Sequence, residues 1–216
     1  MKTLSLKSVL IPIIALTICV LIFQLGYFQM IPVALLLLLA SFLEHKKNGF
    51  RFLGFQRKNL MVKNLLLWAP LCGVLMFMAY AYLILPLVTQ FTGQTIDLSA
   101  FDVYEGDVVS CLVLLVYIWS SAAFAEEIVF RGYLMQQFIK FFGSSTLSVI
   151  LNILLLGLLF GFVHSYQGIT GQIVAGITGM ILAIIFHLRK SDLWFNIVVH
   201  GSIDTVAVLY FYYGWI

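Results

Sequence analysis

The chain has very little charge. Of its 216 residues, 62% are hydrophobic and only 10% are charged, whereas a soluble globular domain has about 25% charged residues. A core of this size cannot bury such an excess of apolar side chains, so lipid must act as the solvent for much of the surface. This composition excludes an ordinary soluble domain, and the length suits one compact helical bundle.

Cysteine is also scarce. Cys19, Cys72 and Cys111 all lie in apolar stretches, and none has a partner at the spacing of a zinc or redox motif. We therefore expect packing residues and no disulfide framework. The net charge of +3 does not indicate a nucleic-acid partner, because the basic residues flank the apolar stretches and form no stripe.

The apolar stretches are long enough to cross a membrane. They are continuous rather than alternating, so they predict an all-α polytopic transmembrane bundle of about seven spans rather than a β-barrel. The first follows two lysines like a secretion signal, but no small-residue cleavage site follows it, and we expect an uncleaved span. The second is short and should form a tight hairpin with the first across Gln29 to Pro32. The predicted spans cover residues 8–28, 30–43, 64–88, 108–127, 146–164, 169–187 and 193–213.

The residues between the spans predict the orientation. Residues 44–63 contain six Lys and Arg and one Glu, whereas residues 89–107 contain four Asp and Glu and no Lys or Arg. The positive-inside rule then makes 44–63 cytoplasmic. Seven spans with a cytoplasmic N-terminus place all twelve basic residues on that side, as expected for a multi-pass protein of the cell membrane.

The basic stretch divides the chain. We expect an N-terminal two-span hairpin with its basic segment over residues 1–63, and a core bundle over 64–216. Phe50, Phe52, Leu53 and Phe55 suggest that part of the basic segment lies on the membrane surface.

Three carboxylates remain inside the predicted spans: Glu126, Glu127 and Asp204. A carboxylate within a bilayer costs a few kcal/mol at least, so the default interpretation is a functional site with partners nearby. Glu127 and Arg131 are four residues apart, so they share a helix face and can form an ion pair. Glu126 is rotated by about 100° from Glu127 and is the freer of the two. A structural ion pair and a catalytic role are equally good interpretations of Glu127 and Arg131.

Two histidines complete the cluster. His164 follows Phe160 by four residues, and His200 precedes Asp204 by four. A desolvated carboxylate beside imidazoles can act as a general base for water, while histidines can stabilise an oxyanion or hold a metal. Asp204 would orient His200 or serve as a further ligand. The motifs G-x-S-x-G and H-E-x-x-H are absent from the sequence, which disfavours a serine nucleophile and an ordinary zincin.

Three motifs occur in a fixed order on separate apolar helices. They are E-E-x-x-x-R over 126–131, F-x-x-x-H over 160–164 and H-x-x-x-D over 200–204. Together they resemble the CAAX protease and bacteriocin-processing family of intramembrane proteases, also called the Abi family, over about residues 108–205. The resemblance implies an intramembrane endopeptidase that acts on a membrane-associated or lipidated peptide, in bacteriocin processing or self-immunity.

The resemblance also implies roles for individual residues. Glu126 and His164 would activate water, and His200 with Asp204 would stabilise the oxyanion or act as ligands. Glu127, Arg131 and Phe160 would support the site. Family members are often described as metallopeptidases, so zinc is a candidate cofactor. Its ligands would be Glu126, His164, His200 and Asp204.

Two other functions fit the same residues. Intramembrane Glu, His and Arg also mark proton relays, so a proton-coupled transporter is one alternative, although inverted repeats and broken helices are not evident. A non-catalytic immunity or scaffold protein is the other.

A single site requires Glu126 and His164 to lie at the same depth. On simple spans they would differ by more than about 10 Å at 1.5 Å per residue. We therefore predict that the helix of Glu126 continues past Arg131 towards Phe141, and that the next helix starts lower, with residues 147–153 below the apolar core.

Overall fold

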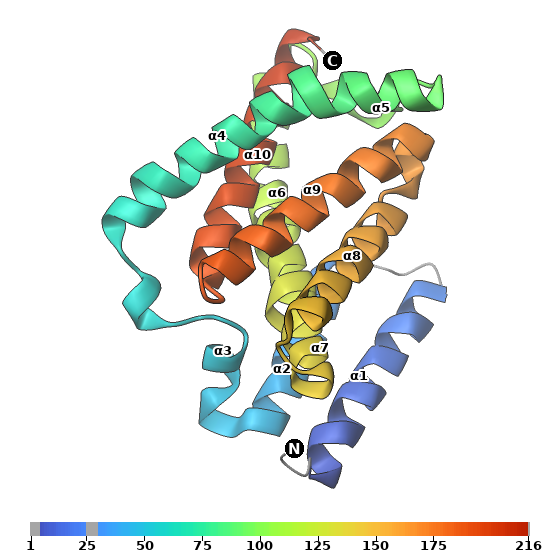
Figure 1. The fold of residues 1–216 in the computed structure, drawn as a ribbon. Helices are drawn as coiled ribbons and strands as arrows, with labels where there is room; N and C mark the ends of the chain where they lie inside the picture. Colours follow the sequence, from blue (N-terminus) through green and yellow to red (C-terminus); the bar gives the residue numbers. More distant parts are fainter. Residues whose placement is uncertain (1–4, 25–29, 216) are drawn as a thin grey trace.

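The protein is a bundle of helices. The computed structural model describes residues 5–24 and 30–215, and over these residues it contains no strand (Figure 1). Six helices are long and apolar enough to cross a membrane, which confirms the predicted all-α polytopic bundle and a multi-pass membrane protein. They cover Leu6–Gln24, Asn64–Thr92, Val108–Phe142, Thr146–Val163, Ser165–Leu188 and Leu193–Tyr213.

The helix expected to be the second span is shorter than the others. α2 (Met30–His45) has 16 residues, which extend about 24 Å, less than the roughly 30 Å of a hydrocarbon core. Over the described residues, six helices therefore have spanning length, against about seven spans predicted. α2 packs against α1 (Leu6–Gln24) as a hairpin partner, but the predicted turn begins at Gln29, outside the described residues.

Two of the long helices contain π-helical segments. Residues 64–92 comprise η3 (Asn64–Trp68), α4 (Ala69–Ala79), η4 (Tyr80–Ile84) and α5 (Leu85–Thr92), of which η3 and η4 are π-helical. Pro70 and Pro86 each follow one of these wide turns. A proline has no N–H for the i→i−4 bond, so the preceding turn must rearrange.

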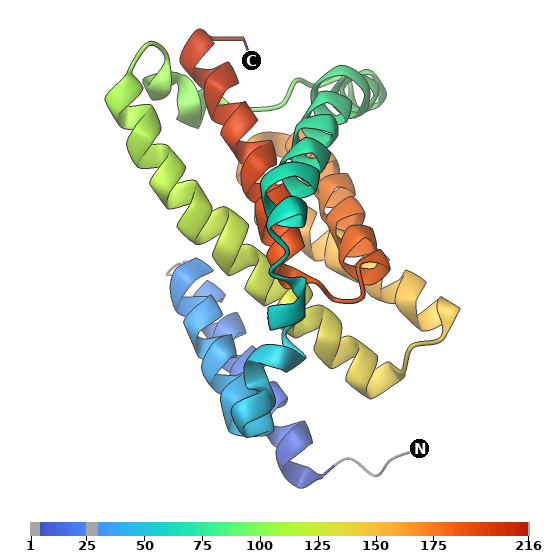
Figure 2. The same cartoon turned by 90° about the vertical axis from the view of Figure 1, so that its left-hand side faces the viewer.

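The helix that carries Glu126 runs continuously for 35 residues, Val108–Phe142, and Figure 2 shows it as one long yellow-green ribbon. Its segments are α6 (Val108–Ile118), η6 (Trp119–Glu126), η7 (Ile128–Met135) and α7 (Gln136–Phe142). Asp107 caps its N-terminus by accepting from the N–H groups of Val109 and Ser110 at 3.0 and 3.1 Å. The predicted continuation past Arg131 is confirmed, and α8 (Thr146–Val163) returns beside it.

The next pair of helices packs through glycines. α8 and α9 (Gly168–Leu188) lie side by side in both views (Figures 1 and 2). A Cβ atom at Gly161 would lie 2.4 Å from the carbonyl oxygen of Gln172, and one at Gly157 would lie 3.0 Å from that of Gly176. Only glycine permits this approach of two backbones, and it places the end of α8 beside the start of α9.

The last helix and the connections complete the bundle. α10 (Leu193–Tyr213) packs on α4, where a Cβ atom at Gly73 would lie 2.6 Å from the carbonyl oxygen of Val199. The short helical connections are η1 (Lys46–Asn48), α3 (Gly49–Phe52), η2 (Arg57–Asn59), η5 (Ser99–Tyr104) and η8 (Ser165–Gln167).

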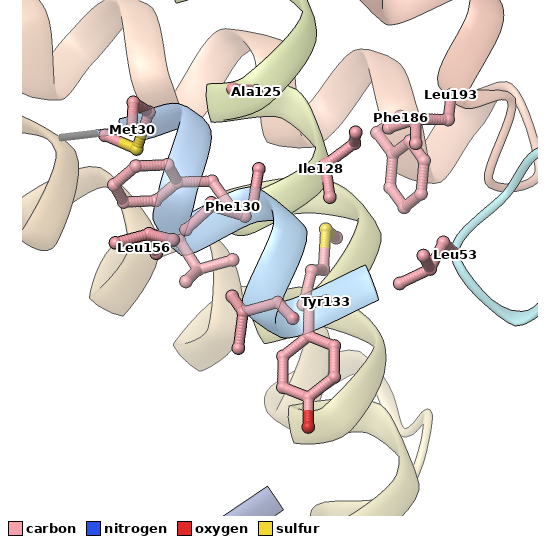
Figure 3. Close-up of a cluster of buried hydrophobic side chains, with 14 of the residues drawn as sticks. Met30, Leu53, Ala125, Ile128, Phe130, Tyr133, Leu156, Phe186 and Leu193 are labelled. Atoms are coloured by element: carbon pink, nitrogen blue, oxygen red, sulfur yellow. The ribbon is translucent and has the colours of Figure 1, made fainter. Parts of the chain in front are cut away.

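The basic segment between α2 and η3 differs in part from the expectation that its apolar residues rest on the membrane surface: Phe50 is exposed, but Leu53 enters the core. Leu53 is fully buried, and Figure 3 shows it pointing towards Leu193 and Phe186. Gly54 has a φ of 102°, and a Cβ atom there would lie 2.6 Å from the carbonyl oxygen of Ser191. This left-handed turn brings Leu53 into contact with the bundle, where it is shielded from water more completely than at an interface.

Candidate active site

A cavity of about 400 Å³ lies inside the bundle, and the residues predicted to form one site line it. Glu126 comes from the long central helix, His164 from the end of α8, and His200 and Asp204 from α10. The convergence of three helices on one cavity is therefore present in the structure. Phe160 also lines this cavity, whereas Glu127 and Arg131 lie behind it, buried in the protein.

Local helix geometry separates the two adjacent glutamates. Glu126 ends one π-helical segment and Glu127 immediately precedes the next. A π-helix has wider turns than an α-helix, and such turns are frequent at functional sites. Glu126 lines the cavity, whereas Glu127 is fully buried and faces three protein donors.

Both oxygens of the Glu127 carboxylate accept hydrogen bonds from these donors. Its Oε1 accepts from Arg131 Nη1 at 2.7 Å and lies 2.9 Å from His200 Nδ1. Its Oε2 accepts from Asn196 Nδ2 at 3.1 Å. An ionised carboxylate is only an acceptor, so Nδ1 of His200 must be the donor. The predicted Glu127–Arg131 pair is present, and it is one part of a larger network.

Arg131 connects three helices at the back of the cavity. Its Nη2 donates to the carbonyl oxygen of Gly179 on α9 at 2.8 Å, and its Cζ lies 4.8 Å from the centroid of the Phe160 ring on α8. A Cβ atom at Gly179 would lie 2.8 Å from Phe160 Cβ. Glycine at this position therefore lets α9 approach closely enough for the guanidinium to reach its backbone.

His200 is oriented by a different carboxylate from the one expected. The sequence suggested Asp204, but its Oδ2 lies 3.6 Å from His200 Nε2, within ion-pair range and too long for a hydrogen bond. Glu127 holds the Nδ1 side at 2.9 Å, so Nε2 is the ring nitrogen on the side of Asp204. The i,i+4 spacing placed Asp204 near the ring, but Glu127 reaches it from another helix at shorter range.

His164 occupies the end of α8 and is held by its own helix. Its Nδ1 lies 2.7 Å from the carbonyl oxygen of Phe160, and a carbonyl can only accept, so Nδ1 donates and Nε2 is left unprotonated in the neutral ring. The Phe160 ring lies 4.7 Å from the His164 ring and 6.0 Å from the His200 ring. Phe160 thus lies next to both imidazoles on the cavity wall.

Glu126 differs from its neighbour in having no fixed partner. Its Oε2 is buried and makes no hydrogen bond with any residue that the structure describes. A buried acceptor without a donor costs about 1–3 kcal/mol, and more when it is charged. Such a group in a polar cavity is suited to binding a donor that enters from outside the chain.

The residues predicted as zinc ligands do not form a ligand set as they are arranged here. Within residues 5–24 and 30–215, no three His, Cys, Asp or Glu side chains are grouped so that they could hold a metal ion.

Residues 108–206 match the family model of the Rce1-like type II CAAX prenyl endopeptidases. This segment belongs to the CAAX protease family. The match begins at the first residue of α6 and ends two residues after Asp204, so it includes all three motifs. No curated protein and no solved structure matches the chain.

The CAAX protease domain also contains a site residue that the sequence analysis missed. Asn196 is fully buried and donates from Nδ2 both to Glu127 Oε2 at 3.1 Å and to the carbonyl oxygen of Leu182 at 2.9 Å. It precedes His200 by four residues, so the pattern N-x-x-x-H-x-x-x-D on one face of α10 was the available signal. Asn196 is a neutral amide, so it was not among the intramembrane charges that indicated a site in the sequence.

Neutral polar residues of the CAAX protease domain complete the cavity lining. Ser121, Tyr166 and Thr178 lie on the cavity wall, and none of them is part of the three sequence motifs. Residues before the domain contribute as well, because Met30 and Tyr80 line the same cavity. The N-terminal part of the chain therefore forms part of the wall around the domain's site.

Proposed function

We propose that this protein is an intramembrane endopeptidase that hydrolyses a peptide bond with a water molecule activated by Glu126. One observation carries the proposal: a buried carboxylate without a hydrogen-bond donor among the described residues shares a cavity with two histidines. A water bound by this carboxylate would satisfy it and would also be the nucleophile. The membership of residues 108–206 in a family of endopeptidases supports the same chemistry.

In the proposed reaction Glu126 acts first as a base and then as an acid, and the other side chains position water and stabilise charge. Glu126 removes a proton from water as the water oxygen attacks the carbonyl carbon, and His164 helps to hold that water through its free Nε2. His200 stabilises the oxyanion through Nε2, with Asp204 beside it supporting the positive ring. Glu126 then gives its proton to the leaving nitrogen as the C–N bond breaks, which yields a carboxylic acid and an amine.

Glu127 and Arg131 take positioning roles in this proposal. All of the donors around Glu127 belong to the protein, so its carboxylate has little capacity left for water. Its contribution is to hold the His200 ring in one orientation by accepting from Nδ1–H, which leaves Nε2–H of the positive ring to face the oxyanion. Arg131 keeps that carboxylate ionised and ties it to α9.

The proposed substrate is a membrane-associated or lipidated peptide. The cavity lies inside a bundle whose exposed helix faces are apolar, so a substrate anchored in lipid has a direct approach. Aromatic residues, including Phe77 and Phe101, line the cavity with the catalytic groups, which suits an apolar peptide or lipid chain. A role in bacteriocin processing or self-immunity rests on the family resemblance and stays a prediction.

The test is cleavage by the purified protein in detergent. Candidate substrates are fluorogenic peptides with and without a C-terminal prenylated cysteine, compared for wild type and Glu126→Gln. Glu105→Gln is the matched control, because Glu105 lies in the connection before α6, outside the cavity. General-base catalysis is worth about 10²–10⁴-fold, so Glu126→Gln should lose at least about 100-fold while the control keeps its activity. Full activity of Glu126→Gln would remove the assigned base.

A further inference from the structure

The basic segment after α2 carries cations that the protein leaves unpaired. Elsewhere, Arg131 pairs with Glu127 at 2.7 Å and Lys140 pairs with Glu44 at 2.8 Å. Six basic residues of the segment have no acidic partner within 4.0 Å among the described residues. They are Lys46, Lys47, Arg51, Arg57, Lys58 and Lys63.

Part of this segment forms a hollow, which we call the basic concavity. It is lined by His45, Asn48, Arg51, Phe52, Gln56 and Lys58. All the polar side chains in this set can donate hydrogen bonds, and no carboxylate is among them. The nearest acidic residue in sequence, Glu44, accepts from Lys140 Nζ at 2.8 Å and Gln137 Nε2 at 2.9 Å, and its Oε1 lies 3.4 Å from Nε2 of the lining residue His45. Among the described residues, Arg51 and Lys58 have no such counter-charge, and their donors suit an oxyanion such as a phosphate.

The backbone under the basic concavity is held in place. Leu53 is buried in the apolar core with Phe186 and Leu193 (Figure 3), and Gly54 is packed against Ser191. On the other side, Ser41 Oγ donates to the carbonyl oxygen of Gly49 at 3.0 Å. The donors therefore sit on a fixed turn rather than on a free tail, so less ordering is required when a ligand binds.

Exposed apolar side chains precede, interrupt and follow the residues of the basic concavity in the sequence. Phe50 is 61% exposed and Val62 is 70% exposed, and Phe42, Leu43, Leu60 and Met61 are exposed as well. A free phosphate ion gains nothing from these groups, whereas a phospholipid has acyl chains to cover them. We propose that the basic concavity binds the headgroup of an anionic phospholipid, with Arg51 and Lys58 on the phosphate and the flanking apolar side chains against the acyl chains.

The test is lipid binding by the full-length protein in detergent, measured by native mass spectrometry. The protein is titrated with phosphatidylglycerol, with the zwitterionic phosphatidylcholine, and with phosphatidylglycerol in the presence of inorganic phosphate. The test variant is Arg51→Gln with Lys58→Gln. The matched control is Lys47→Gln with Arg57→Gln, which removes the same charge from the same segment at positions outside the concavity. All four side chains are exposed, so helicity by circular dichroism should be unchanged.

We expect the test variant, but not the control variant, to lose affinity for phosphatidylglycerol. Each cation at an anionic surface contributes about fivefold in affinity, so the test variant should bind phosphatidylglycerol about 25-fold more weakly, with the control within about threefold of wild type. Equal loss in both variants would mean diffuse charge attraction and would overturn a defined site. Equal affinity for phosphatidylcholine would overturn the anionic headgroup, and displacement by equimolar inorganic phosphate would overturn the lipid as the ligand.

Discussion

The Nδ1 atom of His200 lies 2.9 Å from Oε1 of Glu127, although the two residues are 73 positions apart. This contact joins the first and third motifs of the CAAX protease domain directly. Because the same oxygen also accepts from Arg131 at 2.7 Å, the ring, the carboxylate and the guanidinium form one buried unit. The geometry of the cavity wall depends on that unit remaining intact.

Asn196 should matter for catalysis more than for folding. Its amide is the donor to the second oxygen of Glu127, so Asn196→Ala should free that carboxylate to rotate and weaken its hold on His200. Loss of such an outer partner typically costs about 10–100-fold, and we expect it in kcat rather than KM. Asn152→Ala is the matched control, because Asn152 is also fully buried but its amide donates to the carbonyl oxygen of Met135. The control should lower thermal stability without the loss in kcat; equal effects of the two variants on kcat would contradict a positioning role.

Removing one member of the buried ion pair should be costly. Arg131→Met leaves the Glu127 carboxylate without its main counter-charge in a dry environment, a loss of about 3–5 kcal/mol in the free energy of unfolding. The double variant Glu127→Gln with Arg131→Met removes both members of the pair and should recover part of that stability. Unfolding by denaturant in detergent, followed by circular dichroism, gives both values. Additive losses in the double variant would argue against a coupled pair.

Asp204 should tolerate an isosteric change. Its carboxylate is 3.6 Å from His200 Nε2 and does not hold the ring by a hydrogen bond, so an amide of the same shape should replace it. We expect Asp204→Asn to keep activity within about tenfold and Asp204→Leu to lose more. The activities of the two variants are compared as peptide cleavage rates at saturating substrate. A complete loss in Asp204→Asn would assign a proton-transfer role to the carboxylate.

Metal removal should leave activity in place. The described His, Cys, Asp and Glu side chains form no three-ligand group, and catalytic zinc sites use three protein ligands. Dialysis against 1,10-phenanthroline, with metal content measured by mass spectrometry, should change the cleavage rate by less than about twofold, well below the loss of a metal-activated water. Loss of activity that returns with added zinc would show instead that the ligands rearrange around a metal.

The sequence predicted the parts of the site that follow from helical spacing and charge. Burial of Glu126 and Glu127 in an apolar span required partners, and the four-residue spacing to Arg131 supplied one that the structure contains. The need to bring Glu126 and His164 to one depth also predicted a long helix, and Val108–Phe142 is that helix. These inferences succeeded because the bilayer leaves few places for a charged side chain.

Other features depend on contacts between distant segments. Nothing local to His200 indicated that Glu127 would hold its ring, because i,i+4 spacing reports only neighbours on the same helix. Leu53 looked like an interfacial residue because its flanking charges are exposed, yet the turn at Gly54 brings it into the core. The π-helical turns around Glu126 also have no signature that separates them from an α-helix by hydrophobic periodicity.

The most direct test of the central claim is the structure of the Glu126→Gln variant with a substrate peptide bound. We predict that the scissile carbonyl carbon lies in the cavity between the side chain at position 126 and His200. A water should lie within about 2.6–3.2 Å of the position 126 side chain, and the carbonyl oxygen should point towards His200 Nε2. A peptide bound outside the cavity, or a scissile carbonyl facing away from position 126, would contradict it.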